Sequence, residues 1–445
     1  MTSPSPVSPP PGSPSPVSPA PPPVLSLYHD PNRIWPHEFH FGPPTDETED
    51  ITFYMPGGYH PVRIGDVFSG AKGQYRIMHK LGFGAYATVW LAQTVVTGAL
   101  VALKIPTAGD HGFAEAEMLE AANAAALDHQ CVSEFIDKIP IHGPNGLHCG
   151  IVTEVIVTLA SAGICFQPRR WRKEVAYGMV QAMAQVHRAG IVHGDFHMAN
   201  TGVTVPLSTD AQAQEQLMQD LGEYELTVVL PIDPTKQTAS LPPYIVTPCR
   251  WADHSFNDLA EMKPHIKVYD FGNAYRVGSE NPAFRCAVEA YAPEIECVEK
   301  KERVPIAFSS DIWALGSAIF ETITGTTLFR NISPAMLPER AVQMAGRVPP
   351  QWQAWWDSKP REPLSGDPDA WWDSPEQRDW IINGCADEED VDADEEDDDT
   401  GEEDANGAIC LLKNCLLKKL LALDPSSRPC CEEILRDPWF EDIAS

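Results

Sequence analysis

The sequence predicts an α+β fold in two lobes: a small first lobe with a mainly antiparallel sheet and one key helix, and a larger, mainly helical second lobe. Between Tyr75 and Lys104, three strand-like runs (YRIMHKL, ATVWLAQ and LVALKI) alternate with turn residues, as in a small antiparallel sheet. Residues 113–126 are rich in helix formers and contain no Gly or Pro. Residues 171–190 predict an amphipathic helix that ends at Gly190.

The domain organisation follows from changes in composition along the chain. Residues 1–24 are almost entirely Pro, Ser, Val, Ala and Gly, and such a segment cannot bury enough apolar surface to fold. Folded sequence is expected to begin near Tyr59. The predicted parts are a disordered Pro/Ser-rich tail with an entry segment (1–56), the first lobe with its lead-in (57–156) and the second lobe (157–441).

Charge and cysteine content limit the partners and the compartment. The 445-residue chain has a formal charge of −31, and residues 386–404 hold 14 Asp or Glu without any Lys or Arg. We therefore expect no direct nucleic-acid binding, which needs a basic face, while basic protein partners are allowed. The eleven cysteines show no CxxC spacing, which indicates reduced thiols in the cytoplasm or nucleus. We see no secretory signal or spanning apolar stretch, and expect a monomer without membrane association.

Five short segments carry the functional signal, because they follow one another in a characteristic order. They are LGFGAYATVW at 81–90, VALK at 101–104, HGDFHMAN at 193–200, DFG at 270–272 and APE at 292–294. Each is weak alone, but together they resemble the signature set of a protein kinase catalytic domain. The resemblance covers about residues 75–440. It implies a bilobal protein kinase fold, ATP and Mg²⁺ as cofactors, and transfer of the γ-phosphate to protein hydroxyls.

Other segments narrow this resemblance to one group. DIWALG at 311–316 is similar to the kinase helix whose Asp braces the catalytic loop, and Arg428 stands where kinases have the Arg that pairs with the APE glutamate, here Glu294. The stretch 57–92 and DFGNA at 270–274 resemble the SR-protein kinases, a CMGC-type group of Ser/Thr kinases, and above all its expanded fungal set. This implies protein substrates, with Arg/Ser-rich splicing factors as the candidate class.

Lys104 is the residue that the resemblance places at the α- and β-phosphates of ATP. Such a lysine needs a carboxylate partner, for which Glu115 and Glu117 are the candidates. Glu115 is favoured, because Met118 and Leu119 follow at i+3 and i+4 on the helix face expected to pack inward.

The glycine-rich segment is expected to approach the phosphates with its backbone. Ala87 stands in the third glycine position, and Val89 is expected to cover the adenine ring. The residues expected to bind ATP are Leu81, Gly82, Gly84, Val89, Ala102, Lys104, Glu115, Glu154 and Val155.

The catalytic loop supplies the remaining expected roles. Asp195 would accept the proton of the substrate hydroxyl, and Asn200 and Asp270 would hold Mg²⁺. His197 stands where kinases have a Lys that contacts the γ-phosphate, and His193 is expected to pack and form hydrogen bonds. The expected catalytic residues are Asp195, Lys104, Asn200 and His197.

Two insertions are predicted in the second lobe. Asn200 and Asp270 are far apart in the sequence but hold the same metals in kinases, so residues of about 202–265 should loop out and return. The second insertion, about 331–408, ends in the acidic run. Six of the twelve tryptophans lie between Trp352 and Trp380, and packing onto the lobe is favoured over an aromatic recognition patch.

Some positions depart from the kinase pattern. Gly194 stands where many kinases have the Arg that reads a phosphate on the activation loop. The segment from Asn273 to Tyr291 contains one Ser, Ser279, and no Thr. Together they predict activity that does not depend on loop phosphorylation. Tyr291 replaces an Arg that shapes peptide selection in the group, so Arg/Ser specificity is a hypothesis.

Two other functions stay open at this point. The first is a catalytically weak pseudokinase or scaffold, which His197, Gly194 and Ala87 would support. The second is a small-molecule phosphotransferase of the aminoglycoside-kinase type, which shares the HGDxHxxN pattern. The APE segment, DIWALG and Arg428 count against the second, because these features build the peptide-binding lobe of protein kinases.

Overall fold

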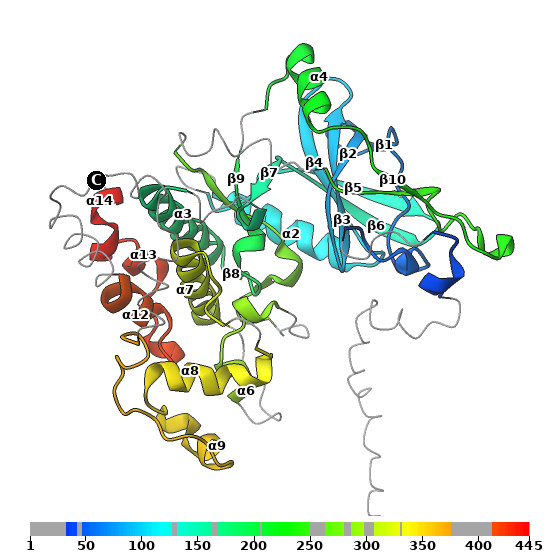
Figure 1. Cartoon of the computed structure of the whole chain (residues 1–445). Helices are drawn as coiled ribbons and strands as arrows, with labels where there is room; N and C mark the ends of the chain where they lie inside the picture. The colour runs from blue at the N-terminus through cyan, green and yellow to red at the C-terminus, as the bar shows by residue number, and fades with distance from the viewer. Residues whose placement is uncertain are drawn as a thin grey trace, which may run out of the picture.

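The computed structural model describes residues 33–41, 47–126, 131–161, 167–204, 207–249, 263–279, 286–297, 307–329, 332–374 and 412–444. In these residues the predicted two-lobed α+β fold is confirmed (Figure 1). The acidic run at 386–404 and the first 32 residues lie outside the described ranges. None of the described helices is long and apolar enough to cross a membrane.

The N-lobe is built on a six-stranded sheet in the order β1-β2-β3-β4-β6-β5, in which neighbouring strands are antiparallel. Side chains alternate between its faces: Leu91 and Ala102 join the main core, whereas Trp90 and Leu103 join a second core. The strands are β1 (Val67–Ser69), β2 (Gln74–Gly84), β3 (Ala87–Thr94), β4 (Leu100–Pro106), β5 (Phe135–Gly143) and β6 (Gly146–Thr153).

One helix, α2 (His111–Ala124), covers the face of the sheet that belongs to the main core. Its Ala116 and Leu119 are buried there, while Glu117 is exposed. The opposite face packs against Val62 and Val246, which come from outside the sheet. Both faces are therefore buried, which explains why β3 and β4 are nearly continuous runs of apolar residues.

The C-lobe is mainly helical, and its core lies between α3 (Arg169–Arg188) and α7 (Phe308–Thr324). The predicted amphipathic helix at 171–190 is found as α3. Helix α7 ends at Gly325, whose φ of 69° closes the helix in the left-handed conformation. The other C-lobe helices are α6 (Glu294–Cys297), α8 (Leu337–Ala345), α9 (Gln353–Asp357), α12 (Lys418–Leu420), α13 (Cys431–Ile434) and α14 (Glu441–Ala444).

Two small sheets lie where the lobes meet. The first has the order β12-β9-β7, with β7 (Ile156–Thr158), β9 (Thr201–Thr204) and β12 (Ile266–Val268). The second pairs β8 (Ile191–Val192) with β13 (Tyr275–Arg276). Because Val203 in β9 pairs with Ile266 in β12, the two ends of the first insertion meet, as the sequence required.

The first insertion returns across the N-lobe (Figure 1). It contains α4 (Ala211–Asp220) and the antiparallel strands β10 (Leu226–Val228) and β11 (Tyr244–Val246). Gln214 of α4 accepts a hydrogen bond from the Gln93 side chain at 2.7 Å and donates one to the Gly98 carbonyl at 2.7 Å. The insertion is thus attached to the sheet at the end of β3 and the turn that follows it.

The prediction that residues 1–56 form a disordered tail and entry segment, with folded sequence from near Tyr59, is wrong for residues 33–41 and 47–56. These contain two short 3₁₀ turns, Pro36–Glu38 and Ile51–Phe53, and bury Ile51, Phe53 and Tyr54. They pack against Val229, Leu241 and Ile245 of the first insertion. Partners so distant in sequence leave no local pattern, so sequence analysis could not anticipate this cluster.

The second insertion begins later than predicted. Leu337, Ala341 and Val342 of α8 are fully buried in the main core, so this helix belongs to the C-lobe itself. Beyond it, Trp352 and Trp372 are buried in the same core, as the packing interpretation requires. Trp380 lies outside the described residues.

Candidate active site

Lys104 lies at the centre of an ion cluster between the lobes. Its Nζ is 2.6 Å from Glu115 Oε1 and 2.8 Å from Asp270 Oδ1. Strand β4 supplies the lysine and α2 supplies Glu115, so the cluster joins the sheet and the helix of the N-lobe to the DFG segment. Of the two candidate carboxylates, the structure brings Glu115 to Lys104 and leaves Glu117 exposed.

The cluster fixes the charges of its members. Burial disfavours the charged form of Lys104, but attraction by Asp270 and Glu115 outweighs it and raises the pKa of Lys104 well above its ordinary value. Burial likewise opposes the charge of Asp270, but Lys104 lowers the pKa of this carboxyl. At Glu115 burial prevails and the pKa is raised. Lys104 and Asp270 are therefore ionised at neutral pH.

The glycine-rich segment forms the end of β2, its turn and the start of β3. Gly82 pairs with Val89 and Gly84 with Ala87. A Cβ atom at Gly82 or Gly84 would meet no atom within 4 Å, so the backbone is open at the positions expected to face the phosphates. Ala87 in the third position is buried and keeps the strand pairing intact.

The other expected nucleotide residues lie on β2, β3, β4 and in the link between the lobes. Ala102 in β4 pairs with Thr153 at the end of β6, and Glu154 and Val155 follow as the link to β7. Val155 is buried, and Glu154 forms an ion pair with Lys267 at 2.8 Å. Leu81 and Val89, on the paired strands β2 and β3, are partly buried.

Asp195 is held from two sides in the loop after β8. Its Oδ2 accepts a hydrogen bond from the Asn273 side-chain amide at 3.0 Å, and its Oδ1 accepts one from the Ala287 backbone at 2.9 Å. His197 Nε2 lies 3.6 Å from Oδ1. Sequence analysis gave no role to the Asn273 side chain or to Ala287. A polar residue directly after DFG is the only available signal for Asn273.

Asn200 ties the loop to itself. Its side-chain amide donates to the Asp195 carbonyl at 2.9 Å and lies 3.1 Å from His197 Nε2. The Ala199 backbone donates to the other ring nitrogen of His197 at 3.2 Å. The expected metal residue Asp270 has a left-handed backbone with φ of 63°, and Gly272 donates to its Oδ1 at 3.3 Å.

Buried polar contacts brace this loop from below, as the DIWALG segment predicted. Asp311 of α7 accepts backbone hydrogen bonds from His193 and Gly194, both at 2.9 Å. His193 also contacts the Tyr269 carbonyl at 3.1 Å. Burial lowers the pKa of His193 in spite of nearby Asp311, so its ring is neutral and serves packing and hydrogen bonding.

The predicted pair of Arg428 and Glu294 is confirmed. The guanidinium donates two parallel hydrogen bonds of 2.8 Å to the two carboxylate oxygens, and donates further to the carbonyls of Ser309 and Ala422. Both side chains are buried. This pair attaches the end of the activation segment to the last part of the C-lobe.

Comparisons with known proteins show what this chain is similar to. The family model described as protein kinase domain matches residues 255–440. The chain is 32% identical over 181 residues to the serine/threonine-protein kinase spk-1 of Caenorhabditis elegans, which covers 37% of this chain and 17% of the relative. It is 35% identical over 122 residues to the human SRSF protein kinase 3, covering 26% of this chain and 21% of the relative. The serine/threonine-protein kinase SRPK of Physarum polycephalum is 27% identical over 304 residues, covering 64% and 67%.

The chain is therefore similar to protein kinases, and among them to relatives named as SR-protein kinases. The match spans only 17% and 21% of the length of the first two relatives named above. A solved kinase domain shares the fold, with a TM-score of 0.51 at 17% identity over 86% of this chain and 99% of that domain. The bilobal protein kinase fold expected from the sequence is confirmed.

Gly194 has a local explanation. Its φ is +75°, and an added Cβ would lie 2.9 Å from the carbonyl oxygen of Asn273. A side chain here would therefore need both a strained backbone and a shift of the DFG segment. The position is shaped by its close approach to Asn273, the same residue that holds Asp195.

Proposed function

We propose that this chain is a serine/threonine protein kinase, an ATP-dependent phosphotransferase acting on protein hydroxyls. One observation carries the proposal most directly: Lys104 joins Glu115 and Asp270 in one ion cluster. In active kinases this linkage aligns the nucleotide with the catalytic loop. The proposal rests also on Asp195, which is held by two hydrogen bonds on the other side of the cleft.

In the proposed reaction each side chain has one task. Asp195 accepts the proton of the substrate hydroxyl and orients its oxygen for in-line attack on the γ-phosphate. Lys104 supplies positive charge to the α- and β-phosphates. His197 takes the place of the kinase lysine that contacts the γ-phosphate, and a histidine offers less positive charge there than a lysine. Turnover is therefore expected to be slow, and this is the specific observation that favours the weak pseudokinase as a second candidate.

The residues expected to hold Mg²⁺ fit that ion. Among the described residues, Asn200 Oδ1 and Asp270 Oδ2 accept no hydrogen bond, since Asn200 uses its amide nitrogen and Asp270 its Oδ1. Carboxylate and amide oxygens are the ligands that Mg²⁺ prefers. When bound, Mg²⁺ neutralises the phosphates, and Asn200 and Asp270 supply its protein oxygens.

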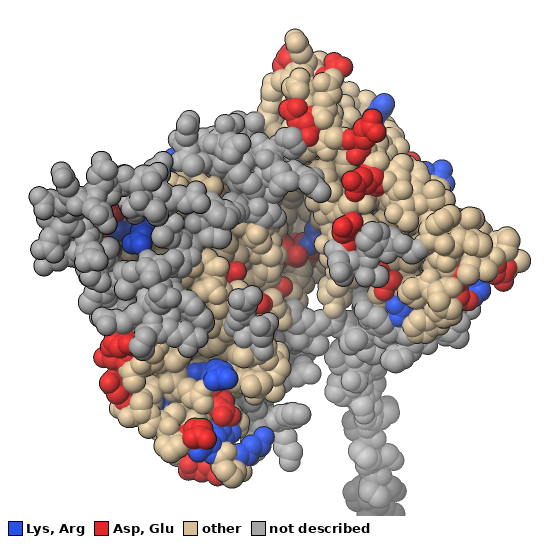
Figure 2. Space-filling view, viewed as in Figure 1, with Lys and Arg blue, Asp and Glu red and all other residues tan. Residues whose placement is uncertain are grey.

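The substrate class is proposed to include basic, Arg/Ser-rich proteins. The relative named SRSF protein kinase 3 supports this, and so does the net charge of −31. Acidic side chains gather near α4 on the face shown in Figure 2. This part of the insertion contributes Asp210, Glu215, Asp220, Glu223 and Glu225 without any Lys or Arg. Cytoplasmic or nuclear location and a monomeric state belong to the same proposal.

Activation-loop phosphorylation is proposed to be unnecessary. With Gly194 instead of Arg, the catalytic loop lacks the cation that would bind a loop phosphate. Asp195 instead receives the Ala287 backbone amide of the activation segment directly. Protein that carries no phosphate should therefore reach full activity without a lag.

The test is phosphotransfer from labelled ATP to a panel of Arg-Ser, Ser-Pro and acidic peptides, with Asp195→Asn and Lys104→Met as matched variants. Transfer should fall by about a hundred-fold or more in each variant, since each removes a group that acts in the transition state. Equal transfer to all peptides would discard the Arg/Ser preference. A wild-type protein that binds ATP but modifies no peptide would be the pseudokinase.

A further inference from the structure

The entry segment, residues 33–41 and 47–59, contacts the glycine-rich loop directly. The hydroxyl of Tyr59 donates a hydrogen bond of 2.8 Å to the carbonyl of Gly84, at the tip of β2. We propose that Tyr59 positions the glycine-rich loop and thereby sets the affinity for the phosphates of ATP. The inference builds on the proposed function, and it gives a role to a residue at the predicted start of the first lobe for which the sequence indicated none.

Tyr59 is itself held in place. Its side chain is 2% exposed, and its ring packs against Phe53 and Tyr54 with ring centres 6.1 and 5.5 Å away. The Asn145 side chain donates to the Tyr59 carbonyl at 2.6 Å. A side chain fixed by packing and by its own backbone loses little further entropy in holding the loop, so its hydroxyl is a preorganised donor.

Backbone contacts also restrain the loop tip. Gly84 pairs with Ala87, and on the far side of the turn the carbonyl of Tyr86 accepts a hydrogen bond from the Thr107 backbone at 2.8 Å. A Cβ at Gly84 would touch nothing within 4 Å, so no packing holds this residue on its open side. Loss of the Tyr59 hydrogen bond therefore removes a side-chain restraint from the glycine that is proposed to lie against the phosphates.

A second contact from the entry segment lies at the base of the same loop. Lys80 in β2 is fully buried and forms an ion pair with Glu49, whose other oxygen accepts a hydrogen bond of 2.5 Å from Tyr54. Lys80 Nζ also lies 5.5 Å from the ring of Phe83, between the two loop glycines. Burial lowers the pKa of Lys80, and the carboxylate of Glu49 opposes this shift. The entry segment therefore stabilises the positive charge of Lys80 at the base of the loop.

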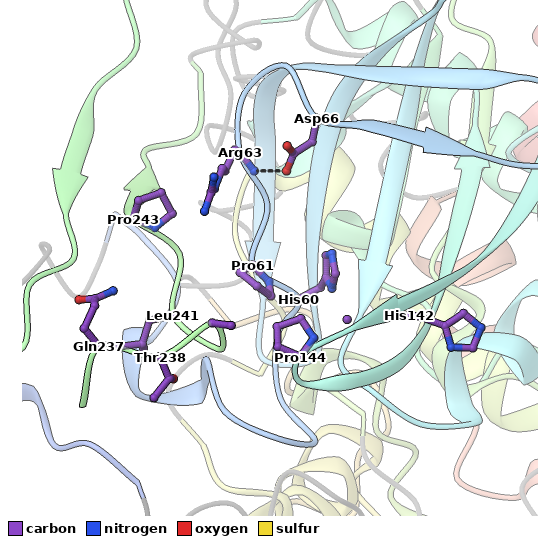
Figure 3. Close-up of a pocket in the computed structure, with 12 residues that line it drawn as sticks. His60, Pro61, Arg63, Asp66, His142, Pro144, Gln237, Thr238, Leu241 and Pro243 are labelled. Carbon is purple, nitrogen blue, oxygen red and sulfur yellow. Dashed lines mark hydrogen bonds between the residues drawn. The ribbon is translucent and has the colours of Figure 1, made fainter. Parts of the chain in front are cut away.

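The first insertion holds the entry segment on the lobe. Phe39 forms a β-bridge with Pro231, and the backbones of His40 and Leu230, and of Ile232 and Glu38, are joined at 2.9 and 2.7 Å. Further along the chain, a cavity of about 420 Å³ separates residues 60–66 from the insertion loop at residues 237–243 (Figure 3). Its walls include His60, Arg63, Asp66, His142, Thr238 and Leu241, none of them expected at the nucleotide site.

The experiment compares the binding of ATP and adenosine to the full chain by calorimetric titration. Tyr59→Phe removes only the hydroxyl, and the ATP affinity should fall by about three- to ten-fold, the range for losing one hydrogen bond. Adenosine lacks phosphates, so its affinity should stay within about two-fold of wild type. The matched control is Tyr75→Phe in β2, the strand that ends at Gly84, where a 1% exposed Tyr donates to Asp137 at 3.0 Å. It should change neither affinity.

Equal ATP affinities in wild type and Tyr59→Phe would overturn the inference. So would a parallel loss for ATP and adenosine, since that is the result of general destabilisation and not of loop positioning. Neither measurement requires phosphotransfer. A wild type without kinase activity would therefore refute the proposed function and leave this comparison intact.

Discussion

Among the residues that the structure describes, each lobe has one ion pair whose two side chains are both less than 10% exposed, and the two pairs are built differently. In the C-lobe, Arg428 and Glu294 have side chains 0% and 6% exposed, and in the N-lobe, Lys80 and Glu49 are 0% and 1% exposed. The guanidinium meets both carboxylate oxygens and two carbonyls. The ammonium meets one oxygen of Glu49, whose other oxygen is bonded to Tyr54.

This difference separates a rigid side of the active site from an adjustable one. A planar guanidinium that forms parallel hydrogen bonds fixes the direction of its partner as well as its distance. An ammonium acts as a point charge and fixes the distance alone. The Arg428 pair attaches the activation segment to the C-lobe, and the Lys80 pair supports the glycine-rich loop. The side proposed to bind peptide is therefore held in direction as well as distance, and the side proposed to bind ATP keeps some freedom.

Removing one buried cation from each lobe tests whether the two ion pairs act differently. Arg428→Met and Lys80→Met each leave a buried carboxylate unpaired, and each should lower the free energy of unfolding by about 3–5 kcal/mol. Urea unfolding measures this. Among the protein that stays folded, only Lys80→Met should weaken ATP binding, because Lys80 alone lies under the loop.

A double variant tests whether charge is the cause. Lys80→Met combined with Glu49→Gln removes both charges and keeps the volumes similar, so most of the lost stability should return. If the double variant is as unstable as Lys80→Met, packing of the lysine stem and not the unpaired charge explains the loss.

The two pairs also differ in how much of them the sequence predicts. Arg428 and Glu294 stand in recognisable motifs, as do Lys104, Asp195, Asn200 and Asp270, because the chemistry demands those residue types at those spacings. Glu115 followed from helix periodicity. Glu49, Tyr54 and Tyr59 stand in a segment preceded by a Pro-rich stretch, and they become functional only through contacts with β2 and with the insertion. These contacts are tertiary, so no local sequence pattern predicts them.

The same limit applies to the boundaries of the elements. Helix α8 has no motif that ties it to the core, so the sequence alone places it in the second insertion. Its burial follows from the space beside α6 and α7, which only the assembled lobe defines. Conversely, the insertion between Asn200 and Asp270 was predictable, because two metal-holding residues must meet whatever lies between them.

Gly194 allows a further test of the rigid, C-lobe side of the active site. Gly194→Arg forces a side chain into a left-handed backbone and toward the Asn273 carbonyl, which an added Cβ would approach to 2.9 Å. It should lower the free energy of unfolding by about 2 kcal/mol and the kcat by about ten-fold. Thermal unfolding and peptide phosphorylation measure both. Gly194→Ala carries the backbone strain and the close Cβ contact without the long charged side chain, so it should account for most of the lost stability. An unstrained, fully active Gly194→Arg protein would contradict this account of the position.

Asn273 offers a smaller and more specific test. Asn273→Ala removes the amide that donates to Asp195 at 3.0 Å, and the kcat should fall by about ten-fold, as for a hydrogen bond to a charged group. The KM for ATP should stay unchanged, whereas Tyr59→Phe should raise that KM and leave kcat nearly intact. Steady-state kinetics with one peptide separates these results. If both variants change the same constant, the two sides of the site are not independent.

The smallest expected effect concerns Glu321 of the C-lobe, a carboxylate whose charged neighbour is the carboxylate of Glu289. Burial, assisted by Glu289, raises the pKa of Glu321 in α7 from its ordinary 4.5 to about 7. Between these two values the folded chain keeps a proton that the unfolded chain releases, so stability falls as the pH rises and stays lower above about 7.

Glu321→Gln removes this penalty, because the amide carries no charge at any pH. Its melting temperature should match wild type at about pH 4 and exceed it by about 2 °C at about pH 8. The exposed Glu432→Gln serves as the control and should show no such pH-dependent gain. If the two variants differ from wild type equally at all pH values, the Glu321 carboxyl is already ionised in the folded chain, and the contrast with the paired Glu294 disappears.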